Sequence, residues 1–180
     1  MRIIAGSHKR RQLKAVDSLN TRSTKDRVKE SLFNMLSLSL DKTHVLDLFA
    51  GSGALGLEAL SRGVKEATFV EKDKVAVDVI QENLKNLELN KRARVYHRDA
   101  LKFLENTTES YDLVLLDPPY HQSLIDESLR LLIENQRLKD DFVIVLLSEK
   151  NLGFRCPDDF EIFKQKTIGV TQVTLLKGRQ

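Results

Sequence analysis

Residues 45–56 read Val-Leu-Asp-Leu-Phe-Ala-Gly-Ser-Gly-Ala-Leu-Gly. The stretch begins as an apolar run of strand length and continues with Gly51, Gly53 and Gly56 in the pattern G-x-G-x-x-G, and a helical pattern covers 54–62. Glycines between a strand and a helix permit a tight turn and let a ligand approach the backbone closely. The stretch therefore predicts the first unit of an α/β fold with a ligand-binding loop, whereas glycines that only turn the chain are the simpler alternative.

Two carboxylates bear on the ligand of this loop. Glu71 follows Gly51 by 20 residues, at the end of the next predicted strand, where a carboxylate can accept hydrogen bonds from both ribose hydroxyls. That pattern alone fits a dinucleotide as well as S-adenosylmethionine. Asp47 favours the second, because an acidic residue before the glycine turn suits an ammonium group and opposes a pyrophosphate. We expect Asp47, Phe49 and Glu71 to bind the cofactor together with the three glycines.

Strand and helix patterns alternate along the rest of the chain. A capping-box pattern at 23–26 predicts the start of one helix, which helical spacing then continues. Helical spacing also predicts a helix over 74–87, capped by Asp73, and another over 124–133. The alternation predicts a Rossmann-like, doubly wound α/β fold, with a seven-stranded, mainly parallel sheet and an antiparallel C-terminal strand. The predicted strands are 45–49, 67–70, 94–96, 111–116, 142–147, 161–166 and 172–176, and the last two should pair as a hairpin.

A second motif, Asp117-Pro118-Pro119-Tyr120, follows the apolar run 113–116. The carboxyl end of a parallel core strand is where open α/β sheets bind ligands. Two prolines stiffen the chain and fix the directions of its carbonyls. An acidic oxygen, a rigid carbonyl and an aromatic face form a receptor for a planar ring that carries an exocyclic amino group. A simple stop between strand and loop is the alternative reading.

Asp99 and Ala100 follow the third predicted strand of the sheet. Because the third strand ends beside the second, Asp99 is placed to accept a hydrogen bond from an adenine amino group. Asp99 can equally cap a helix over 100–104, and one carboxylate can do both.

The net charge of +3 is unevenly distributed. Residues 1–30 carry a net charge of +6, and the remaining 150 residues carry −3. We expect a basic N-terminal β-hairpin extension over 1–22, with strands at 2–5 and 12–16, and a catalytic domain over 23–180. Its basic turn should meet phosphates, although a solvated surface loop would have the same composition. The turn consists of Lys9, Arg10 and Arg11.

Composition argues against a membrane-spanning protein, a disulfide-bonded protein and a metalloprotein. A content of 41% hydrophobic and 31% charged residues is that of a globular protein, and the apolar runs have only strand length, too short to span a membrane. The single cysteine, Cys156, excludes an internal disulfide and fits a reducing cytoplasm, as does the absence of a signal-like N-terminus. The four histidines show no metal-ligand spacing, so we expect no metal.

The glycine loop, Glu71, Asp99 and the tetrapeptide together resemble class I S-adenosylmethionine-dependent amino methyltransferases. More narrowly, residues 2–6, 21–24, 26–30 and 32–34 resemble the RsmD family over essentially the whole chain. The chain departs from the family pattern at two of its positions. Ser23 replaces a usual proline, and Arg10 stands where a glycine commonly follows the basic residue.

The resemblance implies a bacterial, cytoplasmic enzyme that methylates a guanine N2 of 16S ribosomal RNA, as naked RNA or in an assembling small subunit. It implies Asp117, Pro118 and Tyr120 as catalytic residues, and Arg22 and Arg27 as RNA-binding residues beside the basic turn. An adenine-N6 methyltransferase that acts on DNA or RNA is the nearest alternative. A nicotinamide-dependent dehydrogenase would leave the tetrapeptide unexplained, and a non-catalytic RNA-binding module would explain only the basic segment.

Overall fold

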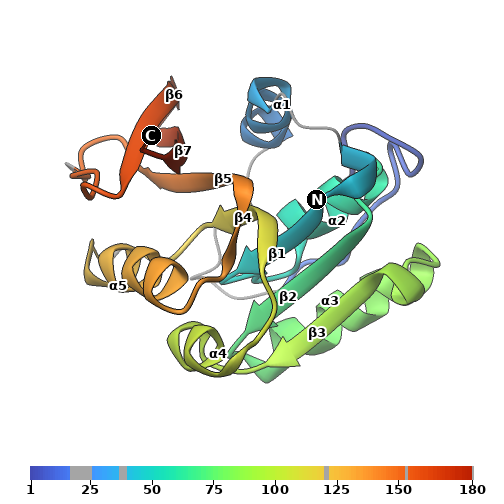
Figure 1. The fold of residues 1–180 in the computed structure, drawn as a ribbon. Coiled ribbons are helices and arrows are strands. Elements are labelled where there is room, and N and C mark those ends of the chain that lie inside the picture. The colour runs from blue at the N-terminus through green and yellow to red at the C-terminus, as the bar shows by residue number, and fades with distance from the viewer. Residues whose placement is uncertain (17–25, 37–39, 120–121, 153, 180) are drawn as a thin grey trace.

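The structure, a computed structural model of the 180-residue chain, describes residues 1–16, 26–36, 40–119, 122–152 and 154–179. These residues form five α-helices, two 3-10 helices and one seven-stranded sheet (Figure 1). The helices are α1 (Asp26–Met35), α2 (Ala54–Ser61), α3 (Lys74–Asn86), α4 (Ala100–Asn106) and α5 (Gln122–Glu134), with η1 (Leu40–Lys42) and η2 (Asn90–Arg92). The strands are β1 (His44–Leu48), β2 (Glu66–Glu71), β3 (Ala93–His97), β4 (Tyr111–Leu116), β5 (Leu138–Glu149), β6 (Phe160–Ile168) and β7 (Thr171–Gly178).

The sheet has the strand order β3-β2-β1-β4-β5-β7-β6. Strands β1 to β5 pair in parallel, whereas β7 pairs antiparallel with both β5 and β6. The last two strands therefore form the predicted hairpin, inserted so that the final strand lies next to β5. This arrangement confirms the predicted fold class.

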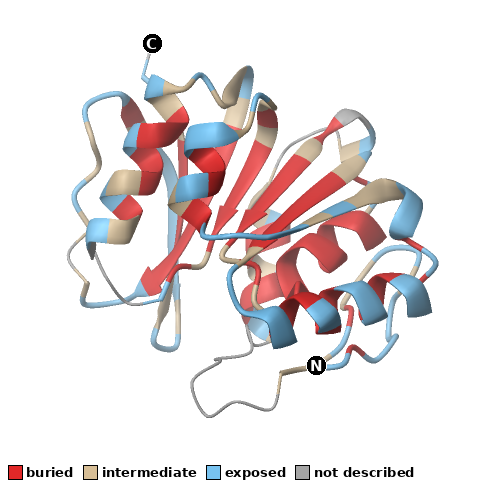
Figure 2. Cartoon of the chain, turned by 90° about the horizontal axis from the view of Figure 1, so that it is seen from below, coloured by how far each residue is buried: buried red, intermediate tan, exposed pale blue. Residues whose placement is uncertain are grey.

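Helices cover both faces of the sheet, as strict alternation along its strands requires. In β4, Leu113 and Leu115 belong to the apolar cluster that includes buried residues of α1, α2 and α3. Val114 and Leu116 belong to the opposite cluster, which includes those of α4 and α5. Figure 2 shows the central strands as the buried layer between the two groups of helices. Because the central strands are buried on both faces, the sequence shows them as continuous apolar runs.

The strand order reverses at β1, which has β2 on one side and β4 on the other. This is the point where open α/β sheets form a ligand crevice at the carboxyl ends of their strands. Asp47 in β1 lies opposite Phe69 in β2 and Leu115 in β4. Glu71 and Asp117 each come two residues later in their chains. The register therefore brings the three predicted carboxylates to one edge of the sheet.

Strand β5 is longer than its apolar run predicts, since it begins at Leu138 and not at 142. Leu138 pairs with Tyr111, and the Lys139 ammonium lies 2.7 Å from the Asp112 carboxylate. Pairing with β4, across a shift in register, thus extends the strand through a polar segment that has no strand pattern of its own. Tertiary contacts here outweigh local propensity.

The predicted N-terminal hairpin is only partly correct. The two segments meet in a single antiparallel bridge between Arg2 and Gln12, and strands of the predicted length do not form. Backbone hydrogen bonds from Ile3 to Arg11 and from Arg10 to Ile3 close the pairing there, and the N–H groups of Ile4 and Ala5 bind the Glu58 carboxylate of α2 at 2.8 and 3.0 Å instead. The segment is therefore held mainly by the body of the protein.

Apolar packing joins the same segment to that body. Ile3 is fully buried and Leu13 nearly so, and both belong to the cluster of α1, α2 and α3. The predicted boundary between residues 22 and 23 lies outside the described residues.

Candidate active site

The glycine loop leaves β1 through a series of left-handed backbone conformations. Phe49, Gly51 and Gly53 have φ angles of 66°, 54° and 78°. Such angles are easy for glycine and rare for a phenylalanine, and rare backbone conformations gather at functional sites. Apart from Gly51 and its two chain neighbours, no described atom lies within 4 Å of where a Cβ of Gly51 would be, so this part of the loop has open space beside it.

Asp47 is almost completely buried beneath the loop. Its Oδ2 accepts a hydrogen bond from the backbone N–H of Gly56 at 2.8 Å. Burial raises the pKa of the Asp47 carboxyl well above its usual range, the Gly56 bond opposes this effect, and the charges of Asp117 and Glu71 add to it. The two neighbours thus act electrostatically on Asp47, as the strand register requires.

Glu71 holds the glycine loop as well as ending β2. Its Oε2 accepts from the Gly51 N–H and its Oε1 from the Asp73 N–H, both at 2.8 Å. These two bonds, which no sequence pattern predicts, fix the carboxylate directly beside the loop. Each oxygen has a second lone pair with which to accept from a ligand.

Asp99 is exposed and caps α4: its Oδ1 accepts from the N–H groups of Leu101 and Lys102 at 3.0 and 3.1 Å. The capping alternative is therefore confirmed, and a contact with adenine remains a prediction. Ala100 is buried as the first residue of α4. Because Glu71 pairs with His97 across β2 and β3, Asp99 follows close to the end of the strand that carries Glu71.

The tetrapeptide begins directly after β4, as predicted. Asp117 is half-buried, Pro118 is buried and Pro119 is exposed. Tyr120 lies outside the described residues. The backbone thus places the Asp117 carboxylate beside the loop after β1, where its charge acts on Asp47.

Three carboxylates therefore converge where β1, β2 and β4 end. Their mutual repulsion makes the edge favourable for a positively charged group, and a bound cation would lower the pKa of Asp47 again. Among the described residues, no group of three or more His, Cys, Asp or Glu side chains, these carboxylates included, is arranged so that it could hold a metal ion. The arrangement suits an organic cation with hydroxyl groups that Glu71 can bind.

The basic residues predicted to bind RNA belong to more than one element of the structure. Lys9, Arg10 and Arg11 are exposed in the N-terminal turn, and Arg27 is exposed on α1. Arg22 falls outside the described residues.

Lys29, one of the basic residues counted in the N-terminal segment, is fully buried. Its ammonium group donates to the carbonyl of Arg2 and lies 3.8 Å from the Glu58 carboxylate, and burial lowers its pKa. Lys29 is thus a structural cation that phosphates cannot reach. Its position four residues before Phe33, in the buried stripe of α1, was the available signal.

Glu58 was also missed by sequence reasoning, although it ties three parts of the structure together. Besides Ile4 and Ala5, it accepts a hydrogen bond from the Arg62 guanidinium at 2.8 Å. A carboxylate inside an otherwise apolar helix, between Leu57 and Ala59, could have indicated a buried ionic partner.

The cysteine and the described helices offer no further candidate for the site. Burial raises the pKa of the Cys156 thiol, which disfavours the reactive thiolate. Among the described residues, no helix combines the length and the apolar character required to cross a bilayer.

The chain matches the family model "Conserved hypothetical protein 95" over residues 1–177. It is 39% identical over 181 residues to ribosomal RNA small subunit methyltransferase D of Haemophilus influenzae, covering 99% of this chain and 94% of the relative. The protein of the same name from Escherichia coli K12 is 38% identical over 170 residues, with coverage of 94% and 85%. The solved structure of yhhF from Escherichia coli superimposes with a TM-score of 0.90 at 36% identity, covering 99% and 97% of the two chains. Because the family model and these relatives span nearly all of its length, the chain belongs to the ribosomal RNA small subunit methyltransferase D family.

Proposed function

We propose that the protein transfers the methyl group of S-adenosylmethionine to the exocyclic N2 of a guanine in small-subunit ribosomal RNA. One observation carries the proposal: Asp47, Glu71 and Asp117 converge at the switch point of the sheet, beside a glycine loop. The names of the full-length relatives supply the substrate class, since both are small-subunit ribosomal RNA methyltransferases. They do not favour the adenine-N6 alternative.

The carboxylates below the loop match a cofactor with a cationic end. Glu71 is proposed to bind the ribose hydroxyls, and the buried Asp47 to stabilise the positive charges of the sulfonium and ammonium groups through the loop. Phe49, Gly51, Gly53 and Gly56 are proposed to shape the binding surface between them, which the left-handed φ angles of the first three support. Asp99 and Ala100 are proposed to contact the adenine ring, with Asp99 retaining its role as the cap of α4.

Asp117 and Pro118 are proposed to orient the nucleophile. The Asp117 carboxylate and the Pro118 carbonyl would accept hydrogen bonds from the guanine amine and favour a pyramidal nitrogen, which binds the transition state more tightly than the ground state. Tyr120 would stack on the base once the base has left the RNA stack. S-adenosylmethionine supplies a methyl group on a positively charged sulfur.

The nitrogen lone pair forms the new N–C bond as the S–C bond breaks, and the sulfur retains the electron pair. The nitrogen, now cationic, releases its proton to water, so the residues need to supply only position and charge. Alignment of nitrogen and methyl group accounts for most of the acceleration in this scheme.

A transfer assay tests the proposal. The purified protein is incubated with isotopically labelled S-adenosylmethionine and with unmethylated small ribosomal subunits or their RNA, and the RNA is digested to nucleosides. We expect label in N2-methylguanosine. Label in N6-methyladenosine would establish the adenine alternative, and RNA without label in either form would contradict the proposal.

A further inference from the structure

The basic N-terminal turn lies at the edge of the sheet opposite the three carboxylates. The Ser7 N–H donates to the carbonyl of Ser61, the last residue of α2, at 2.8 Å. A ring nitrogen of His8 lies 3.0 Å from the carbonyl of Leu87, at the end of α3. Both helices begin at the carboxyl edge of the sheet and end at its amino edge. Figure 1 shows the blue N-terminal segment beside these helix ends.

The turn is held there rigidly. The Ser61 hydroxyl donates to the carbonyl of Ala5 at 2.6 Å and accepts from the His8 N–H at 3.0 Å. A Cβ on Gly6 would lie 1.9 Å from the Ser61 carbonyl oxygen, so this close contact requires glycine. The Arg11 guanidinium donates to the carbonyl of Asn86 at 3.0 Å. The segment is therefore a fixed part of the surface.

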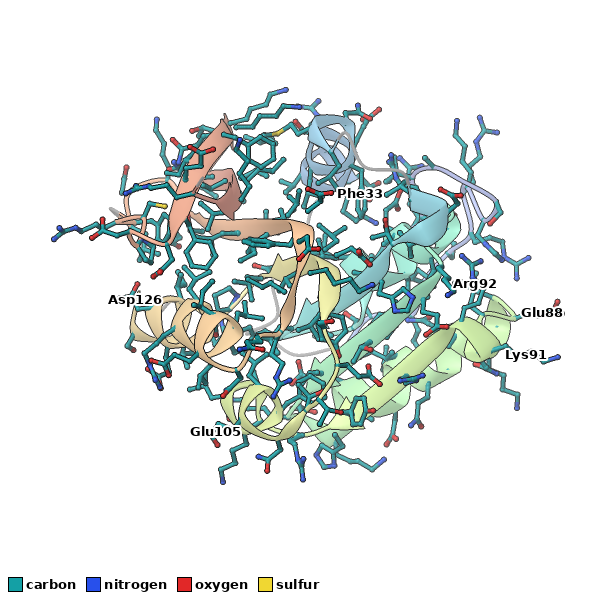
Figure 3. All side chains as sticks on the ribbon, viewed as in Figure 1. Phe33, Glu88, Lys91, Arg92, Glu105 and Asp126 are labelled. Atoms are coloured by element: carbon teal, nitrogen blue, oxygen red, sulfur yellow. The ribbon has the colours of Figure 1, made fainter. Side chains whose placement is uncertain are left out.

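Three lysines from elsewhere in the chain extend the positive charge of the turn. Lys85 lies in the last turn of α3, Lys91 in η2 and Lys65 immediately before β2, all near the ends of the same two helices. The three side chains are exposed and make no ion pair or hydrogen bond with the described residues. Figure 3 shows Lys91 at the far end of α3, pointing away from the body. Together with Lys9, Arg10 and Arg11 they form what we call the amino-edge surface.

Cations near helix ends can serve the helix alone, because they complement the negative end of its dipole. Arg92 does this: its guanidinium donates to the carbonyls of Leu60 and Lys65 at 3.2 and 3.3 Å. The lysines of the amino-edge surface make no such bonds, although the carboxylates of Glu66 and Glu88 lie next to them in the chain. Arg11 does serve the end of α3 through Asn86, but the other five exposed cations exceed what two helix ends require.

We propose that the amino-edge surface binds the phosphate backbone of the RNA substrate at a place remote from the reacting base. This inference rests on the proposed function and adds Lys65, Lys85 and Lys91 to the RNA-binding residues. Helix α3 has 13 residues and spans about 20 Å, which separates the surface from the carboxylates. That length corresponds to roughly six steps along an RNA strand. A short oligonucleotide around the target base would not reach the surface.

Paired neutralisations test the proposal in the full-length chain. The variant Lys65→Gln/Lys91→Gln alters the surface without touching the N-terminal turn. The matched control, Lys150→Gln/Lys166→Gln, makes the same change in net charge at two exposed lysines directly after β5 and on β6. Binding of small-subunit ribosomal RNA is followed by fluorescence anisotropy over a salt series, and S-adenosylmethionine affinity confirms that each variant is folded.

We expect the Lys65/Lys91 variant to show a log–log salt slope that is shallower by up to about two units, and the control to keep the wild-type slope. With a hairpin RNA of fewer than six base pairs around the target guanine, the two variants should bind equally. Equal slopes on the long RNA, or equal losses in variant and control, would overturn the proposal. Because anisotropy needs no turnover, these outcomes are independent of the transfer assay, whose failure would instead remove the proposed function.

Discussion

The side chain of Asp47 accepts a hydrogen bond from the backbone N–H of Gly56, with 2.8 Å between Oδ2 and N. The bond spans the glycine loop, from β1 to the first turn of α2. The same carboxyl is buried and feels the charges of Asp117 and Glu71. The Asp47 carboxyl thus fixes the loop by its hydrogen bond, and its ionisation is unfavourable at this buried position. A substitution that keeps the acceptor and removes the charge separates the two effects.

The Asp47→Asn variant should be more stable than the wild type at neutral pH and should bind S-adenosylmethionine more weakly. Because the pKa of Asp47 is raised in the folded state, the stability that this carboxyl contributes is fully present below its unfolded pKa of about 3.9 and is lost as pH rises through its folded pKa. Asparagine retains the acceptor for Gly56 and removes the titration. Urea unfolding at a series of pH values should show the variant's advantage growing with pH; a constant difference would contradict the assignment.

Gly56→Ala should destabilise the protein more than Gly51→Ala does. A Cβ on Gly56 would lie 2.3 Å from Cε1 of Phe69, a fully buried ring, and such overpacking costs about 1–3 kcal/mol. At Gly51 there is space for a Cβ, and the cost arises from the φ of 54°, about 1 kcal/mol. Chemical denaturation measures both. If the order were reversed, strain in the loop and not helix packing would dominate.

Glu71→Ala and Glu71→Gln should weaken the binding of S-adenosylmethionine to different extents. Alanine removes the acceptors for Gly51 and for the ribose, and should cost about 1–3 kcal/mol of binding free energy. Glutamine keeps one carbonyl acceptor, so its loss should be smaller. Calorimetric titration with S-adenosylmethionine gives both values, and unchanged affinity in the alanine variant would reduce Glu71 to a structural residue.

Asp117→Ala should abolish methyl transfer while cofactor affinity stays within several-fold of the wild type. The carboxylate is assigned to the attacking amine, so its loss should appear in turnover at saturating RNA. Asp141→Ala, which removes an exposed carboxylate near the start of β5, is the control and should retain activity. Near-normal turnover of the Asp117 variant would exclude the assignment.

The sequence predicted best where residues act through their immediate neighbours. The glycine loop, Glu71 and Asp117 lie at the carboxyl ends of neighbouring strands, so the strand register alone placed them together. The sequence predicted poorly where contacts between distant parts of the chain determine whether a residue is buried or how a segment pairs. Lys29 looked like a surface cation, yet a buried carboxylate 29 residues away holds it inside.

The N-terminal hairpin is a second case of a distant contact, because its backbone donors bind a helix that no local pattern links to them. The lysines of the amino-edge surface form a third. Lys65 and Lys91 come near each other only because β2 and β3 are parallel neighbours, each preceded by a connection at the same edge.

Arg10→Gly should stabilise the protein and weaken RNA binding at the same time. Arg10 has a φ of 70°, in the left-handed region, and its N–H donates to the carbonyl of Ile3 at 3.0 Å, so the turn fixes this conformation. Relief of the backbone strain exceeds the extra chain entropy that glycine loses on folding, with an expected gain of about 0.5–1 kcal/mol in the free energy of unfolding.

The control, Arg10→Ala, removes the same charge and keeps the strain. Glycine should therefore exceed alanine in thermal stability, while both should show the same reduction in the salt dependence of RNA binding. Equal stabilities would place the strain elsewhere in the turn, and undiminished salt dependence in both variants would remove Arg10 from the amino-edge surface.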